Sequence, residues 1–386
     1  MSEQGEFDWD PRSETVQADQ INAYDEMRRR CPVARSRHGY ASVFRHADVL
    51  RLALDHDTFS SAVSRFPAVP NGMDPPEHTE FRALIDRYFS DAEVDAFLPA
   101  CRRLSQQLLD TLPEGETIDF MATFSRYFAM EVTCAYLGWP EHLHEPLMAW
   151  TRKNYRATLK RDEKALSAVA LEFDGYITAL LEERRQAGEQ APNDATTRLL
   201  HERIFDRPLT DTEIVSILRN WTVGELATIA ACVGILVEYL AGHPDLQRQL
   251  REQPALLPPA IDEILRIHPP LIMNRRVATK ATEVSGVPIA ANERLALLWA
   301  SANRDEAVFG DPDEFRLDRD PALNLLYGAG IHYCPGAYLS REQLRVVMTV
   351  LLEGTQNIRP APDEKPTFAS YPGSGFSTLP LQLVKK

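Results

Sequence analysis

One cysteine of this sequence lies in a setting that favours metal-ligand chemistry. Residues 327–336 read YGAGIHYCPG, and the glycines of this segment let the backbone turn sharply and pass close to something flat. Pro335 suits a first helical turn and residues 337–344 favour a helix, so Cys334 is predicted at a helix N-terminus. Helix-end N–H groups and the positive end of the helix dipole stabilise a sulfur anion there, and the thiolate is the form of cysteine that binds metal ions.

Two interpretations of Cys334 are open at this point. A lone cysteine is most often a small buried residue, whereas a thiolate at a helix start is the electron-donating axial ligand that a ferric heme needs. The glycines and His332, two residues before the cysteine, favour the ligand. The remaining cysteines have no such setting and no paired spacing, which predicts thiols and no disulfides for Cys31, Cys101, Cys134 and Cys232.

The cysteine segment resembles the heme-binding loop of the cytochrome P-450 superfamily, usually written F-x-x-G-x-H-x-C-x-G. Tyr327 stands where the family has Phe, so an aromatic ring near the sulfur is retained. The resemblance implies a bacterial-type heme-thiolate oxidoreductase with heme b (iron protoporphyrin IX) as its cofactor and Cys334 as its iron ligand. It also implies that Gly328 and Gly336 lie against the heme. The implied fold is mainly α with a small β region, and the heme lies between a long central helix and the cysteine loop.

A second segment, residues 74–82, resembles the family's D-P-P-x-H-x-x-x-R. There a His and an Arg four residues apart share one helix face and bind a heme propionate, and the matching residues are His78 and Arg82. Arg276, at the start of a predicted strand, and His332 match the family's other propionate contacts. The resemblance therefore implies four hydrogen-bond donors for two carboxylates. Each residue taken singly is also compatible with an ordinary surface charge.

Glu263 and Arg266 resemble the family's E-x-x-R pair, and their spacing places both side chains on one helix face. In the family this pair is structural and locks the core behind the heme, with a third charged partner further along the chain. Arg319 is the candidate for this partner. The pair alone is weak evidence, because such i,i+3 pairs occur on any exposed helix.

The long helix departs from the family at the position of its acid and alcohol. The family reads [A/G]-G-x-[D/E]-T there, and the two side chains deliver the protons that dioxygen cleavage requires. Aligned on Gly224, this sequence has Leu226 at the acid position and Ala227 at the alcohol position, so both groups are missing. Ordered water, a substrate hydroxyl, or the displaced Glu225 and Thr228 remain as proton sources. The structural alternatives are that Glu225 pairs with an arginine and that Thr228 bonds to its own helix.

Four hypotheses of function follow from the resemblance and this departure. The first is dioxygen-dependent hydroxylation of a small, largely hydrophobic molecule in secondary metabolism, with the substrate assisting proton delivery. The second is oxidative coupling, cyclisation or desaturation without oxygen insertion. Peroxide-driven turnover ranks last among the reactions, because the Arg-Pro pair of such relatives is absent from this helix. A non-catalytic heme sensor or carrier on the same fold belongs to a different class.

The substrate is expected on the heme face opposite Cys334, against the long helix. The positions that contact substrate in the family predict a largely hydrophobic substrate site in this chain, with two polar anchors, Asn220 and Asn274. Trp221 is as compatible with core packing as with substrate contact. The other candidate wall residues are Phe66, Pro67, Val69, Val223, Gly224, Ala227, Leu271, Ile272, Met273, Ser374, Gly375 and Phe376.

Turnover needs two electrons and therefore an electron donor. The sequence contains no G-x-G-x-x-G pattern after a strand that would indicate a fused dinucleotide-binding segment. The resemblance therefore implies a separate ferredoxin or flavodoxin with its NAD(P)H-dependent reductase. Arg87 and Arg341 are expected to steer this acidic partner to the cysteine side. The chain itself is expected to be a monomer.

Charge and hydropathy restrict the partners and the location. A formal net charge of −14 argues against nucleic acid or an anionic membrane as the main partner. The polar, acidic N-terminus is neither a signal peptide nor a membrane anchor. The longest apolar run, residues 226–237, is shorter than the roughly 20 residues that cross a bilayer. The protein is therefore expected in the cytoplasm.

Periodicity predicts the elements that position these groups. Helical spacing dominates the chain, prolines mark helix boundaries, and no linker or repeat divides it, so we expect one domain over residues 1–386. A helix over residues 210–240 is nearly free of charge in its middle, which is typical of a helix that runs through the core. Short strands are predicted at residues 41–44, 276–287 and 379–384.

Overall fold

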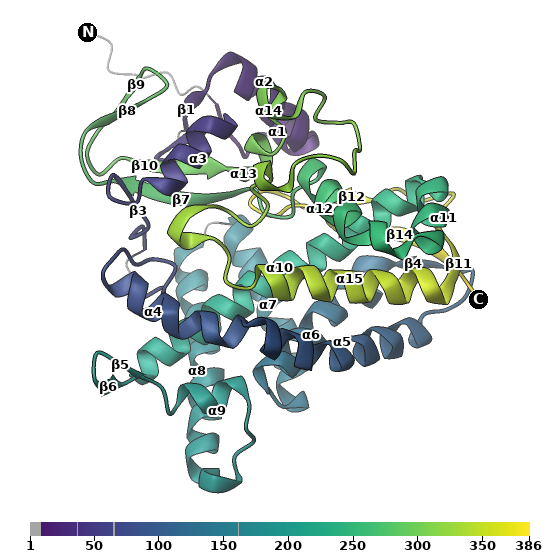
Figure 1. Ribbon diagram of the computed structural model, residues 1–386, viewed down its shortest axis with the longest axis horizontal. Helices are drawn as coiled ribbons and strands as arrows, with labels where there is room; N and C mark the ends of the chain where they lie inside the picture. Colours follow the sequence, from purple (N-terminus) through teal and green to yellow (C-terminus); the bar gives the residue numbers. More distant parts are fainter. Residues whose placement is uncertain (1–8, 37, 65, 161) are drawn as a thin grey trace.

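The computed structural model describes residues 9–36, 38–64, 66–160 and 162–386. The chain forms a large helical body with fewer β-strands, some of which lie above the helices at the left of Figure 1 and others at its right. This arrangement confirms the predicted fold class, mainly α with a small β region.

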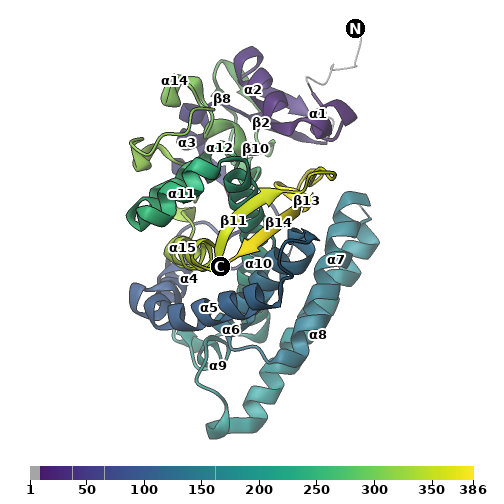
Figure 2. The same ribbon diagram turned by 90° about the vertical axis from the view of Figure 1, so that its right-hand side faces the viewer.

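One long helix, α10 (Asp211–Gly242), runs through the helical body and confirms the helix predicted over residues 210–240 (Figure 2). It begins at a capping box, in which Thr210 and Glu213 bond to each other's backbone N–H groups. By length and composition the whole of α10 could span a membrane, although the apolar run alone could not. However, 61% of its most apolar 18-residue window is buried inside the protein, which marks α10 as a core helix.

Two clusters of buried side chains surround α10. One packs its C-terminal half against α5 (Asp91–Thr111), α6 (Arg126–Leu137), α12 (Leu257–Ile267) and α15 (Ala337–Gly354). The other packs its N-terminal half against α6, α7 (His144–Lys160) and α8 (Glu163–Ala187). Helices α7 and α8 lie side by side at the edge of the molecule (Figure 2). Packing at both ends fixes the position of the middle of α10.

The remaining helices are short or lie nearer the surface. They are α1 (Glu14–Ala18), α2 (Gln20–Arg30), α3 (His46–Leu54), α4 (Glu77–Asp86), α9 (Ala195–Leu199), α11 (Pro244–Glu252), α13 (Trp299–Ala302) and α14 (Glu306–Phe309). Helices α4 and α15 lie on the side of the molecule that faces the viewer in Figure 1.

The largest sheet has five strands in the order β1-β2-β10-β7-β3. These are β1 (Val33–Ser36), β2 (Tyr40–Val43), β10 (Arg294–Leu298), β7 (Met273–Ala278) and β3 (Phe59–Ser60). A three-stranded sheet joins β11 (Thr355–Pro360), β14 (Pro380–Lys385) and β4 (Thr117–Asp119). Two-stranded sheets pair β5 (Arg203–Ile204) with β6 (Arg207–Pro208), β8 (Thr282–Val284) with β9 (Val287–Ile289), and β12 (Thr367–Phe368) with β13 (Phe376–Thr378). The three predicted strand regions are thus confirmed.

Glu263 and Arg266 form a buried ion pair, with side chains 5% and 1% exposed. Arg266 donates to Glu263 over 2.8 and 2.9 Å, and also to the backbone carbonyls of Asn303 and Pro312. Arg319 donates to the same carboxylate over 2.9 Å, so the predicted third partner is confirmed. The three side chains tie α12 to the segment that leads into the cysteine loop, which is a structural role.

Candidate active site

The cysteine loop, residues 327–336, is held by backbone contacts. The N–H of Cys334 donates to the carbonyl of Tyr327 over 2.9 Å, which closes the loop on itself. Gly328 and Gly330 adopt left-handed φ angles of 75° and 71°. A Cβ on Gly330 would collide with the carbonyl oxygen of Ala53 in α3, so this close approach requires glycine.

Cys334 lies just before α15 rather than at its start. The helix begins at Ala337 with Gly336 as its N-cap, whereas Pro335 was predicted in the first turn. Burial raises the pKa of the Cys334 thiol, and the hydrogen bond from the N–H of Gly336 only partly opposes this effect. The Gly336 N–H thus favours the thiolate, as predicted for a helix start, and a positive group bound beside the sulfur would favour it further.

Two histidines meet at the cysteine loop, of which His78 is buried and His332 is half-buried. The ring centroids of His78, in α4, and His332 are 4.4 Å apart. The Nε2 atom of each ring is buried without a hydrogen-bond partner among the described residues. Burial, together with Arg276, lowers the pKa of His332 to about 3, and burial with Arg82 lowers the pKa of His78. Two buried polar atoms left without partners indicate a site that a ligand completes.

Arg276 is a third buried group at this site. Its side chain on β7 is 6% exposed, and it donates to the backbone carbonyl of Arg275 over 2.8 Å. No carboxylate of the described residues lies within ion-pair distance of it, and burial lowers its pKa. Asp74 opposes this shift only in part. An incompletely compensated buried cation is costly, so Arg276 and the two imidazoles together suit a further anion.

Arg82, unlike Arg276, has several partners within the protein. It pairs with Asp86 over 2.6 Å and donates to the carbonyls of Ile331 and Tyr333 over 3.1 and 2.6 Å. It therefore anchors the cysteine loop to α4 on both sides of His332. Its contact with a propionate stays a prediction.

The middle of α10 has an open face. Val223 is 41% exposed, and Gly224 and Ala227 are also exposed, although all three lie in a core helix. A Cβ on Gly224 would meet no atom within 4 Å. Leu226, in contrast, is 6% exposed and packs in the cluster around the N-terminal half of the helix, while Thr228 is half-buried. The open residues line space that the protein does not fill.

Glu225 connects α10 to α15. Its Oε1 atom accepts a hydrogen bond from Nε2 of Gln343 over 2.8 Å, and Gln343 is fully buried. Burial raises the pKa of Glu225 to about 7, and the Gln343 hydrogen bond opposes this shift. The partner of Glu225 is thus a glutamine rather than the arginine considered from the sequence. Its role as a proton relay stays a prediction.

Known proteins are similar to this chain in sequence and in fold. The sequence model of the cytochrome P-450 family matches residues 141–383. The erythromycin C-12 hydroxylase of Saccharopolyspora erythraea is 30% identical over 339 residues, which cover 84% of each chain. The chain belongs to the cytochrome P-450 family. With relatives of this kind, it is a monooxygenase-type oxidoreductase.

Solved P-450 structures superimpose closely on this chain. A mutant of P-450 EryK in complex with erythromycin B gives a TM-score of 0.87 at 28% identity, covering 95% of this chain and 96% of that chain. The P-450 enzyme CxnD, described for C–S bond formation in chuangxinmycin biosynthesis, gives a TM-score of 0.85 at 28% identity and covers 96% of both chains. The fold that the sequence resemblance implied is therefore confirmed.

Cytochrome P-450 enzymes use heme, and the residues of this site fit that group. The buried donors of His78, His332 and Arg276 lack an anion, which the heme propionates provide. The open face of α10 leaves room for a flat group. The glycine-rich loop carries Cys334, whose thiolate a positive group bound beside the sulfur would favour.

Several of the predicted substrate-binding residues have exposed or half-buried side chains. Phe66 is 70% exposed, Leu271 is 40% exposed and Phe376 is half-buried. Together with the open face of α10, they are available to contact a small molecule, and these contacts stay predictions.

Other predicted substrate-binding residues are engaged within the protein. Asn220 donates to the carbonyl of Val69 over 2.9 Å, and Val69 is 1% exposed. Trp221 is buried against Phe89, with ring centroids 5.1 Å apart, which supports the core-packing alternative. Asn274 accepts a hydrogen bond from the indole of Trp299 over 2.7 Å, and Ile272 is 2% exposed. Substrate contact by these residues stays a prediction.

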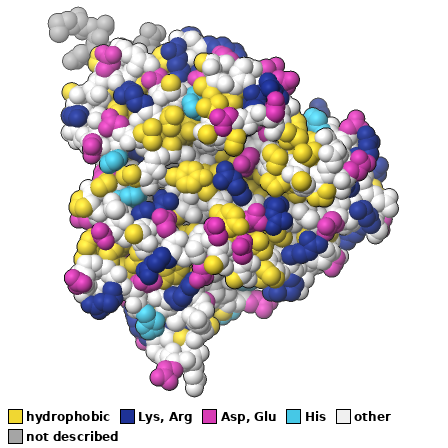
Figure 3. All heavy atoms as spheres, viewed as in Figure 1, with side chains coloured by type: hydrophobic (Ala, Val, Ile, Leu, Met, Phe, Trp, Pro, Cys, Tyr) yellow, Lys and Arg dark blue, Asp and Glu magenta, His cyan; other side chains and the backbone are white. Residues whose placement is uncertain are grey.

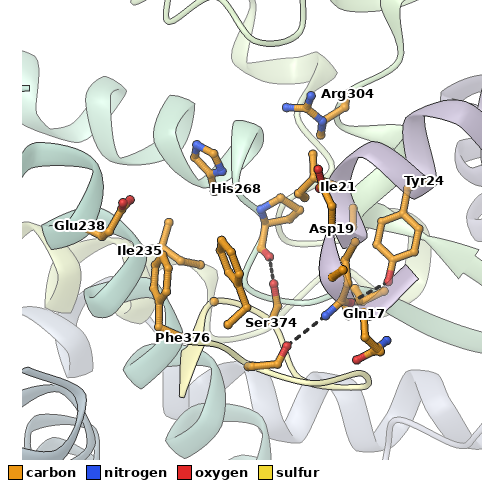
Figure 4. Close-up of a pocket in the computed structure, with 18 of the residues that line it drawn as sticks. Gln17, Asp19, Ile21, Tyr24, Ile235, Glu238, His268, Arg304, Ser374 and Phe376 are labelled. Carbon is orange, nitrogen blue, oxygen red and sulfur yellow. Dashed lines mark hydrogen bonds between the residues drawn. The ribbon is translucent and has the colours of Figure 1, made fainter. Parts of the chain in front are cut away.

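A separate cavity of about 300 Å³ lies beside the C-terminal half of α10 (Figure 4). Its wall includes Ile272 and Phe376, which the sequence assigned to the substrate site. It also includes Glu238 and His268, which the sequence analysis did not single out. The available signal was a carboxylate near the end of an apolar helix, but nothing local shows that the carboxylate faces a cavity.

Proposed function

We propose that this P-450 hydroxylates a small, largely hydrophobic molecule in secondary metabolism, with dioxygen as the oxidant. The observation that carries the proposal is a set of buried donor groups without a compensating anion, His78, His332 and Arg276, beside the loop of Cys334. The similarity to the erythromycin C-12 hydroxylase supports hydroxylation of an organic molecule. The apolar open face of α10 supports a hydrophobic substrate.

Each part of the site has a separate proposed role. Bound heme supplies a thiolate-ligated iron that activates dioxygen for oxidation of the substrate. Cys334 would ligate the iron, and the propionates would be held by His78, Arg82, Arg276 and His332. The residues that would pack against the porphyrin are Tyr327, Gly328 and Gly336.

Proton supply is the step for which this chain departs from its family. Val223, Gly224 and Ala227 on the open face have no proton to donate, and Leu226 is packed in the core. We therefore assign proton delivery to a hydroxyl of the substrate or to ordered water, with Thr228 and the Gln343-bound Glu225 as candidate relays.

Oxidation without oxygen insertion is the second candidate function. The similarity to CxnD, described for C–S bond formation, supports it. The open helix face does not separate the two functions, because both consume protons when dioxygen is cleaved. Turnover under ¹⁸O-labelled dioxygen separates the two functions. Hydroxylation predicts labelled product, whereas product free of label would leave only the second candidate.

The redox partner is proposed to be a separate ferredoxin or flavodoxin with its NAD(P)H-dependent reductase. Arg87 is 61% exposed and pairs with Glu202, and Arg341 pairs with Asp262 and lies over the ring of Tyr327. Figure 3 shows basic, acidic and hydrophobic side chains intermixed on the side that carries α4 and α15. We propose that the partner docks on this side, and that the protein acts as a cytoplasmic monomer.

The ligation by Cys334 has a direct spectroscopic test. The reduced, carbon-monoxide-bound protein is expected to show the long-wavelength Soret band of thiolate ligation, and Cys334→His is expected to abolish it while heme is retained. Cys101→Ser, at a buried cysteine of α5 outside the loop, serves as the control. A wild-type protein without this band, or a Cys334→His variant that keeps it, would refute the assignment.

A further inference from the structure

The cavity beside the C-terminal half of α10 is distinct from the proposed heme site. Glu238 and Ile235 project into it from α10, and Asp19 and Tyr24 lie across it on the side of α2 (Figure 4). Its wall contains none of the cysteine-loop residues, neither His78 nor Arg276, and no residue of the open face of α10. It does include four residues that the resemblance to the family assigned to the substrate site, Ile272, Ser374, Gly375 and Phe376. Ile235 lies eight residues beyond Ala227, about 12 Å along the helix axis.

The loop that contains Ser374 and Gly375 forms one wall of this cavity and is firmly placed. The Ser374 hydroxyl donates to the carbonyl of Pro269 over 2.5 Å (Figure 4). A Cβ on Gly375, whose φ is 76°, would lie 3.3 Å from the side chain of Ile235. The cavity is therefore bounded by contacts already made within the protein, and a volume of about 300 Å³ suits a small ligand.

Glu238 has a carboxylate that no ion pair among the described residues compensates. Among the described residues its carboxylate makes no ion pair and no hydrogen bond, and it lies in the last turns of α10. No basic residue occupies the last turn of this helix, and the negative end of the helix dipole disfavours an anion there. Burial raises the pKa of Glu238, and His243, which caps the helix and is not part of the cavity wall, only partly opposes this shift. A cation bound in the cavity would therefore stabilise the carboxylate of Glu238.

The other polar groups of the cavity wall do not supply that cation. Arg304 is 2% exposed and is saturated by Asp25 and Asp313, over 2.8 and 2.6 Å. Burial, with Arg304, lowers the pKa of His268 to about 4, so its ring is neutral at pH 7. Asp19 adds a second carboxylate at the cavity, where it caps α2. The charged groups of the wall are thus mostly acidic.

Aromatic rings complete the cavity. Phe376 stacks on Phe368 with ring centroids 5.4 Å apart, and Tyr24 contributes a third ring. Aromatic faces attract organic cations, and a nearby carboxylate adds to that attraction. We infer that this cavity is a binding site for a small organic ammonium cation with an apolar or aromatic body, separate from the heme chamber.

The test uses the heme-loaded protein and benzyltrimethylammonium, whose quaternary nitrogen has no lone pair with which to ligate iron. Calorimetric titration is expected to show saturable binding, and Glu238→Gln is expected to weaken it about tenfold. Glu252→Gln removes an exposed carboxylate from the neighbouring helix α11 and is expected to leave the affinity unchanged. Equal affinity of Glu238→Gln and wild type would overturn the inference.

Two further measurements distinguish binding in this cavity from binding at the iron or by apolar contact alone. Ala369→Trp fills the cavity wall without removing the carboxylate, and the backbone groups of residue 369 keep their hydrogen bonds, so it is expected to abolish binding in a folded protein. Saturating the iron with imidazole is expected to leave the affinity for the cation unchanged. Displacement of the cation by imidazole, or equally tight binding of the uncharged carbon analogue neopentylbenzene, would overturn the proposed site.

Discussion

Arg276 is expected to stabilise the heme-loaded protein and to destabilise the heme-free protein. Arg276→Met removes a buried cation that has no acidic partner among the described residues. Heme loss to an excess of apomyoglobin is expected to be about tenfold faster, because a propionate loses its donor. Heme-free protein is expected to gain roughly 1–3 kcal/mol in urea unfolding, because an unpaired buried charge disappears. Arg275→Met, at the exposed neighbour, is the control, and unchanged heme loss in Arg276→Met would contradict the assignment.

Ala227 is the residue at which a proton donor can be restored most simply. Its side chain lies on the open face of α10, whereas an acid at Leu226 would be buried in the core cluster. Ala227→Thr is therefore expected to lower the hydrogen peroxide released per NADH consumed, by at most roughly an order of magnitude. The measurement uses reconstituted turnover with substrate. An unchanged ratio would show that the substrate, water, Glu225 or Thr228 already supplies the protons.

At the scale of elements, Glu225 makes the contact between α10 and α15 sensitive to pH. Burial raises its folded pKa from 4.5 to about 7, so between these values the unfolded chain releases its proton first and folding stability falls as pH rises. Glu225→Gln removes this penalty, and its stability advantage over wild type is expected to grow between pH 5 and pH 8, by up to about 3 kcal/mol.

The measurement of this effect is urea unfolding of the heme-loaded protein at both pH values. Glu252→Gln, which removes an exposed carboxylate, is expected to show no such difference. A pH-independent advantage of Glu225→Gln would argue that Glu225 stays charged in the folded protein.

Two arginine pairs with the same spacing should differ in their effect on stability. Arg266 is buried with Glu263 in α12, whereas Arg248 pairs with Asp245 on the surface of α11. Arg266→Ala is expected to cost about 3–5 kcal/mol, because it leaves a buried carboxylate with reduced compensation. Arg248→Ala is expected to cost less than about 0.5 kcal/mol. Denaturant titration checks both values, and similar losses would remove the structural role proposed for the buried pair.

Much of the architecture could be predicted because it depends on local patterns. The apolar middle of α10 indicated a core helix, and the turn at Ser285 and Gly286 indicated the strands on either side of it. Short strands such as β3 and β10 escaped prediction, because their pairing joins segments far apart in the chain.

Some features of the site were predicted correctly from the sequence and others were not. The cysteine loop and the buried donors follow from a motif, and Arg319 was placed correctly with Glu263. The start of α15 was predicted two residues too early, because the loop continues to Gly336 before the helix begins. The engagement of Asn220 with Val69 and the cavity at Glu238 arise from tertiary packing, which the local sequence does not encode. That residues 1–386 form one domain stays a prediction, and residues 1–8 lie outside the described residues.

At the scale of the whole molecule, the redox partner is expected to dock on the side that carries α4 and α15. Arg87→Glu is expected to slow reduction of the iron by ferredoxin about threefold to tenfold at low salt and to flatten its salt dependence. Lys153→Glu is the matched control, because Lys153 is 54% exposed and also pairs with a glutamate, but lies on α7 at the edge of the molecule (Figure 2). Stopped-flow reduction measures both. Equal slowing by the two variants would indicate a loss of general attraction rather than of a docking site.

The unpartnered Nε2 atoms of His78 and His332, and the buried Arg276, which forms no ion pair among the described residues, have a consequence for the protein in its cell. A chain that folds before it meets its porphyrin must bury these groups without compensation, so it populates open states more often than the loaded form does. A ligand that binds only the folded state shifts this balance by mass action, and open chains are the ones that proteases degrade. The steady-state amount of this enzyme should therefore follow the supply of porphyrin and iron, and iron starvation should deplete the polypeptide as well as its activity.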